Sequence, residues 1–125
     1  MSDFDLSSYK PLYLQTARNY IRDIRDAVGM LQQQNTDKDA IKKIYISAHS
    51  LKSQSILMGY NQVGNLCMKI ELYFKPLKEQ GGSVPQPVIE VLQKIVTEFT
   101  ATMDTIESEN KERDLSSISS AWETI

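Results

Sequence analysis

Residues 38–80, KDAIKKIYISAHSLKSQSILMGYNQVGNLCMKIELYFKPLKEQ, decide the fold. Apolar residues recur there at steps of three and four, which is the spacing of amphipathic helices. The pattern breaks at Gly59, a residue that favours the left-handed conformation at a helix end, and Asn61 is a good cap for the next helix. The stretch therefore predicts a helical hairpin, with helices over residues 38–58 and about 61–80.

The same spacing continues on both sides of this hairpin. A long helix over about residues 8–34 is expected to begin with Ser8 as its cap and Pro11 in its first turn. After the loop GGSVPQP, another helix is expected over about 85–108. Leu115, Ile118, Trp122 and Ile125 keep helical spacing, so a short fifth helix is expected to pack back onto the others.

A capping residue and a proline refine the expected ends of the two hairpin helices. Thr36 or Asp37 is placed to cap the helix that starts at residue 38, and Pro76 is expected to kink the following helix or loosen its last turn. Four long helices with short connections predict an all-α fold, an up-and-down antiparallel four-helix bundle with a short fifth C-terminal helix. We expect a single domain over 1–125, with the bundle over about 6–108 and the C-terminal helix or tail over 109–125.

The composition restricts the classes of function. The chain has 125 residues and a net charge of −2, which is too small to indicate nucleic acid or a lipid surface as the main partner. One cysteine and one histidine form neither an internal disulfide nor a metal site. The acidic start MSDFDLSSYK is unlike a signal peptide, and no stretch approaches the roughly 18–20 apolar residues of a membrane span. We expect a cytoplasmic monomer.

The only histidine, His49, lies in the first helix of the hairpin. On a helical wheel it falls about 100° from Ala48, which lies at the centre of the apolar stripe. The ring is therefore expected at the shoulder of the core, open to solvent and supported by apolar side chains. Its expected neighbours are Tyr45, Lys52, Ile56 and, further out, Ser53.

The hairpin also brings an acid to this histidine. Between Ala40 and Lys78 the charged residues are six lysines and Glu71. If the two helices run antiparallel about a turn near Tyr60, residues whose numbers sum to about 120 lie opposite each other. His49 then faces Glu71.

This pairing has a chemical meaning. A carboxylate that accepts a hydrogen bond from Nδ1–H fixes the imidazole tautomer, leaves Nε2 as the nucleophile and supports positive charge on the ring. Lys52 lies one helical turn from His49, where it could neutralise an incoming phosphoryl group. The arrangement suits reversible phosphorylation of histidine.

The stretch AHSLKSQSILMGY resembles the signature of histidine-containing phosphotransfer (HPt) domains, and in particular the amino-terminal phosphotransfer domain of CheA-type chemotaxis kinases. The likeness covers about residues 6–108, including the opening helix SYKPLYLQTARNYI. Glu71 matches the family's histidine-orienting glutamate. The matching signature positions are Ala48, His49, Ser50, Leu51, Lys52, Gly59 and Tyr60.

The resemblance implies that His49 is phosphorylated on Nε2 and passes the group to an aspartate of a response-regulator receiver domain. ATP would belong to a histidine-kinase catalytic domain and Mg²⁺ to the partner domains, with no cofactor bound by this chain, which has no glycine-rich nucleotide loop. A lysine-rich surface would complement an acidic receiver pocket. The expected partner-binding residues are Tyr45, Ser50, Ser53, Ile56, Met68 and Lys75.

The sequence departs from the family at two positions. Ser53 stands where the family usually has glycine, so its side chain could narrow access to His49, or its hydroxyl could donate to phosphoryl oxygens. Met68 stands where some CheA-type domains carry a second histidine. The surroundings of His49 are therefore expected to differ from those usual in the family.

Other functions are weighed against phosphotransfer. A non-catalytic helical adaptor would bind signalling partners without using His49, yet the histidine, lysine and glutamate are all present. A hydrolase based on Cys67 is disfavoured because Cys67 falls on an apolar stripe, and a serine nucleophile would lack a second histidine. Whether the chain is a free-standing protein or one domain of a longer kinase stays open.

Overall fold

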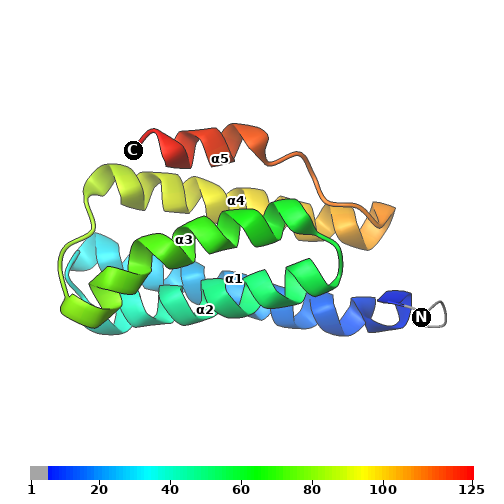
Figure 1. The fold of residues 1–125 in the computed structure, drawn as a ribbon, viewed down its shortest axis with the longest axis horizontal. Helices are drawn as coiled ribbons and strands as arrows, with labels where there is room; N and C mark the ends of the chain where they lie inside the picture. Colours follow the sequence, from blue (N-terminus) through cyan, green and yellow to red (C-terminus); the bar gives the residue numbers. More distant parts are fainter. Residues whose placement is uncertain (1–5) are drawn as a thin grey trace.

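The computed structural model describes residues 6–125, in which every regular element is helical (Figure 1). Residues 1–5 lie outside this range, so the expectation for the acidic start of the chain is not addressed. The elements are a 3-10 helix η1 (Leu6–Tyr9), α1 (Lys10–Gln33), α2 (Lys38–Leu57), α3 (Asn61–Gln80), α4 (Gln86–Glu109) and α5 (Ser116–Glu123). None of these helices is long and apolar enough to cross a bilayer.

The four long helices pack as a bundle, which confirms the predicted all-α fold. α2 packs against both α1 and α3, and α1 also packs against α4. α5 lies along α4 at the outside of the bundle (Figure 1). The hairpin of α2 and α3 therefore forms one side of the bundle, and its outer surface carries the exposed His49.

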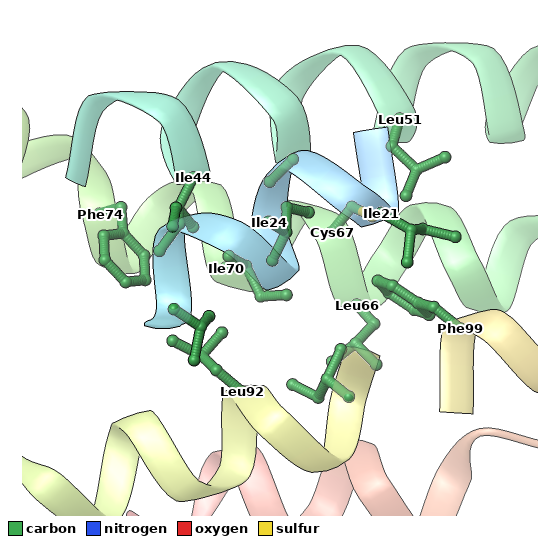
Figure 2. Packing of buried hydrophobic residues seen from close by; sticks show 14 of the residues in the cluster. Ile21, Ile24, Ile44, Leu51, Leu66, Cys67, Ile70, Phe74, Leu92 and Phe99 are labelled. Carbon is green, nitrogen blue, oxygen red and sulfur yellow. The ribbon is translucent and has the colours of Figure 1, made fainter. Parts of the chain in front are cut away.

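The core consists of the apolar stripes of all four long helices (Figure 2). The buried cluster draws residues from each of these helices, and Tyr20 and Leu77 pack against it half-buried. Burial of each large apolar side chain stabilises the fold by about 1.5–3 kcal/mol. The largest fully buried side chains include Phe74, Phe99, Ile24, Leu31, Ile41, Ile44, Leu51 and Leu66.

Two of the expected helix caps differ in the structure. Ser8 lies in η1, and Tyr9 occupies the N-cap position of α1, because the chain already turns in a 3-10 helix before Lys10. Asn61 is the first residue of α3, behind Tyr60 at the N-cap. The predictions that Ser8 and Asn61 act as caps were therefore wrong.

The hairpin turn explains the shift at Asn61. Gly59 has φ +86°, the Gly59 N–H donates to the Ile56 carbonyl at 3.0 Å, and the Tyr60 N–H donates to the Ser55 carbonyl at 2.8 Å. This pattern closes α2 and returns the chain to helical geometry at once. The other end of α2 is as predicted, since the Asp37 side chain accepts a hydrogen bond from the Ala40 N–H at 3.0 Å.

α3 ends at the predicted residue, Gln80, and α5 ends at Glu123. α3 continues through Pro76 to Gln80, and the Gly81 N–H closes its last turn on the Leu77 carbonyl at 2.8 Å. The expected fifth helix is present and buries Trp122. Ile125, expected to extend its stripe, lies beyond the helix and is exposed.

Gly64 sets the spacing between α2 and α3. A Cβ added to Gly64 would lie 2.5 Å from Cγ1 of Ile56 on α2, well inside van der Waals contact. The Ile56 side chain therefore packs in space that a side chain at position 64 would occupy. This contact is about two helical turns from Glu71, so it also influences how near Glu71 comes to α2.

Substitution of Gly64 should separate the two helices. We expect Gly64→Ala to destabilise the protein by about 1–3 kcal/mol, because Ile56 must move. The matched control is Gly29→Ala in α1, where an added Cβ meets nothing within 4 Å and should stabilise by about 0.5–1 kcal/mol. Urea unfolding of both variants measures the difference, and equal effects would contradict the role of Gly64.

Candidate functional site

His49 lies on the outer shoulder of α2. Its neighbours Ala48 and Leu51 are fully buried, whereas the His49 side chain is 54% exposed. The apolar residues of α2 therefore fix the helix in the bundle while the imidazole remains open to solvent. The helical wheel placed the ring in this position.

α3 brings Glu71 to the ring of His49. Nδ1 of His49 lies 2.7 Å from Oε2 of Glu71, whose side chain is only 12% exposed. An ionised carboxylate can only accept a hydrogen bond, so the hydrogen lies on Nδ1 and Nε2 of the neutral ring carries the lone pair. The structure thus brings together the two residues that the hairpin register paired.

Lys52 binds the same carboxylate. Its Nζ donates to Oε1 of Glu71 at 2.7 Å, and its side chain is 22% exposed. The sequence suggested that Lys52 would meet a phosphoryl group directly, but here its ammonium group holds Glu71. Both oxygens of Glu71 are therefore engaged, one by each of the two residues on α2.

These contacts determine the charge of Glu71. Burial raises the pKa of the carboxyl group, but the hydrogen bonds from Lys52 and His49 and their positive charges outweigh burial. The pKa of Glu71 is therefore lowered below its ordinary value. Glu71 is ionised at neutral pH, as a hydrogen-bond acceptor for the imidazole must be.

Tyr45 and Lys78 extend the site toward the far end of the hairpin. The rings of Tyr45 and His49 are nearly parallel, at 15°, with centroids 6.4 Å apart. Nζ of Lys78 lies 4.8 Å from the centroid of the Tyr45 ring, a cation–π distance. Lys78 was not among the predicted site residues, although the hairpin register places it opposite Lys42, one turn from Tyr45.

The remaining predicted site residues differ in their exposure to solvent. Ser53 is exposed, and its hydroxyl donates to the His49 carbonyl at 3.2 Å, so it bonds to the helix backbone. Ile56 and Met68 are exposed apolar residues, at 46% and 41%. Lys75 is exposed and Ser50 is half-buried.

His49 does not line the most apolar of the grooves formed by residues 6–125. That groove, of about 310 Å³, is lined by residues of η1, α1 and the end of α2, including Tyr9, Leu12 and Leu57. An open helical surface suits a macromolecular partner better than a small substrate. Cys67 is fully buried, and burial raises the pKa of its thiol, which disfavours the hydrolase alternative.

A helical bundle that presents an exposed histidine held by a carboxylate defines the class of histidine phosphotransfer domains. The comparisons with known proteins agree: residues 9–121 match the family described as "Hpt domain", and the chain belongs to this family. It is a phosphotransfer domain of two-component signalling.

Curated relatives include chemotaxis proteins. The chain is 21% identical over 116 residues to the chemotaxis protein CheA of Bacillus subtilis, an alignment that covers 92% of this chain and 17% of that protein. It is 22% identical over 81 residues to CheA of Listeria monocytogenes, covering 65% of this chain and 13% of the relative. The chain thus spans less than a fifth of the length of these relatives. No solved structure gives a significant match.

The lowered pKa of Glu71 predicts how stability depends on pH. Its hydrogen bonds stabilise the fold while it is ionised, so their contribution is present above about pH 5 and is lost as the pH falls through the lowered pKa. We expect Glu71→Gln to lower the free energy of unfolding by about 1–3 kcal/mol at pH 7 and by less at pH 3. Urea unfolding across this pH range measures the difference.

Glu107→Gln is the matched control, because Glu107 also forms an ion pair, with Arg18, but its side chain is 65% exposed. Its effect should be small at every pH. A destabilisation by Glu71→Gln that stays constant between pH 7 and pH 3 would contradict the prediction.

Proposed function

We propose that His49 accepts a phosphoryl group on Nε2 from the ATP-bearing catalytic domain of a histidine kinase and passes it to an aspartate of a response-regulator receiver domain. The observation that carries the proposal is the exposed imidazole whose Nδ1 is held by Glu71 at 2.7 Å. The family match and the chemotaxis relatives support the same class of reaction.

In the first transfer, the Nε2 lone pair attacks the γ-phosphorus of ATP. The N–P bond forms, the bond between phosphorus and the bridging oxygen breaks, and ADP leaves. The ring then carries its hydrogen on Nδ1 and a positive charge, which the Glu71 carboxylate stabilises through the hydrogen bond. In the second transfer, a receiver carboxylate oxygen attacks phosphorus, and the N–P electron pair returns to the ring.

Within this mechanism Lys52 acts through Glu71. A protonated Glu71 would no longer be an anion beside the ring, and the hydrogen bond from Lys52 favours its ionised form. Lys52 also fixes the orientation of the carboxylate by occupying the second oxygen. Glu71 and Lys52 are thus positioning residues, and His49 is the residue that touches the phosphoryl group.

The surface around His49 supports macromolecular partners. Exposed apolar side chains, Ile56 and Met68, lie toward the turn of the hairpin, while Lys75 and Lys78 lie toward the opposite end. Such a surface can bury apolar area against a receiver domain and complement its acidic pocket. ATP and Mg²⁺ belong to the partner domains in this proposal, and the domain acts as a cytoplasmic monomer.

Phosphorylation of His49 has a direct chemical test. Incubation with a CheA-type catalytic fragment and radiolabelled ATP should label the protein with an acid-labile, base-stable phosphate, and His49→Gln should remove the label. Glu71→Gln should remain folded and take up label about tenfold more slowly or worse, because the ring loses its support. A wild-type protein that binds the kinase fragment and receiver but takes up no label would instead indicate an adaptor.

A double-mutant cycle tests how Lys52 acts. If it acts through Glu71, Lys52→Met should slow labelling in the wild type and have little further effect in Glu71→Gln. A full additional loss in the Glu71→Gln background would mean that the ammonium group meets the phosphoryl group itself. Because both partners are largely buried, the effect of Lys52→Met should also depend little on salt.

A further inference from the structure

α3 makes contacts on a second face, opposite the one that carries Glu71. Lys69 and Tyr73 are each two residues from Glu71, which places them about 160° around the helix from it. Glu71 faces α2, whereas Lys69 and Tyr73 contact the part of the chain that follows α4. We call residues 112–123 the C-terminal segment.

The C-terminal segment caps the start of α3. The Glu112 carboxylate accepts hydrogen bonds from the backbone N–H groups of Gln62 and Val63, each at 3.0 Å. In return, the side-chain oxygen of Gln62 accepts from the Leu115 N–H at 2.7 Å. α3 has no side-chain cap from Tyr60 at its own N-cap position, so a residue 50 positions away in the sequence supplies it.

The segment also holds the middle of α3 on both sides of Glu71. Nζ of Lys69 donates to Oγ of Ser119 at 2.7 Å and pairs with the Glu123 carboxylate. Trp122 is buried and packs edge-on against Tyr73, with ring centroids 5.4 Å apart. These contacts follow α5 as it runs along the bundle (Figure 1).

The contact at Tyr73 continues into the core. The ring of Tyr73 packs edge-on against Phe74 at 5.3 Å, and Phe74 lies beside Ile44 of α2 (Figure 2). A line of aromatic rings therefore joins α5 through α3 to the interface with α2. Trp122 is therefore connected by ring contacts to Phe74 on the helix that carries Glu71.

The hydrogen bond between His49 and Glu71 tolerates little movement of α3. At 2.7 Å it is near the short end of the range, and a separation of α2 and α3 by roughly 0.5 Å along the bond would bring it to the ~3.2 Å limit of a good hydrogen bond. α3 also contains Pro76, which leaves the Leu72 carbonyl without its helical donor. Contacts from outside the helix therefore add to its packing against α2 in fixing its position.

We propose that the C-terminal segment is a positioning element for the histidine site: its contacts through Glu112, Lys69 and Trp122 hold α3 so that Glu71 stays in hydrogen-bonding register with His49. Its effect on phosphorylation rests on the proposed function, whereas its effect on the imidazole does not. The segment touches neither His49 nor Glu71 and acts only through α3.

The tautomer population of His49, measured by NMR, tests the positioning role directly. His49 is the only histidine of the chain, so its ring ¹⁵N signals are unambiguous in NMR spectra. In the wild type the neutral ring should be held as the Nδ1–H tautomer, and Glu71→Gln defines the spectrum of a ring without its carboxylate. Glu112→Gln, Lys69→Gln and Trp122→Ala should each shift the tautomer population toward that of Glu71→Gln. Labelling from ATP should slow in parallel, by up to about tenfold.

Glu107→Gln is the control, since it removes an ion pair between α4 and α1 and no contact of α3. It should leave the tautomer and the labelling rate unchanged. If Trp122→Ala fails to fold, the surface variants Glu112→Gln and Lys69→Gln decide the question. Folded forms of both variants with the wild-type tautomer population would overturn the proposal. Shifted tautomers in the variants, together with a wild-type protein that takes no label, would uphold the positioning role and overturn phosphotransfer.

Discussion

The hydrogen bond between Nδ1 of His49 and Glu71 is the interaction on which the site depends, and it constrains two helices at once. α2 and α3 must be antiparallel, in one register and close together. The turn at Gly59, with its positive φ, sets the register, and the missing side chain of Gly64 permits the close approach. The turn and the close approach thus pair His49 with Glu71, and contacts from outside the hairpin add to the fixing of α3.

One carboxylate accepts hydrogen bonds from two partners, Lys52 and His49, and this sharing has an electrostatic consequence. Glu71 is largely buried, where a lone charge would be costly, yet Lys52 occupies one oxygen and His49 the other. The positive charge that develops on the ring during phosphorylation therefore forms beside an anion that is already desolvated and oriented. Little reorganisation is needed at that moment, which is how preorganised charge lowers a barrier.

Much of the fold and the pairing at its centre can be predicted from sequence, because both follow from local periodicity. The apolar stripes identify the helices, Gly59 marks the turn, and counting outward from the turn pairs His49 with Glu71. The hydrogen-bond partner of a flexible side chain does not follow from local periodicity. Lys52 can reach either solvent or Glu71 from the same backbone, and the Ser53 hydroxyl can bond to its own helix or to a ligand.

Contacts between distant parts of the chain were also beyond local patterns. Nothing in the sequence near Glu112 indicates that it caps a helix that begins some 50 residues earlier. Because Asn61 was expected to cap α3 itself, no cap from another part of the chain was predicted. The separation of Glu112 and α3 in the sequence has a structural consequence. A local cap would stabilise α3 alone, whereas Glu112 ties the helix that carries Glu71 to the end of the bundle. The position of a reactive side chain then depends on residues that no motif around the histidine contains.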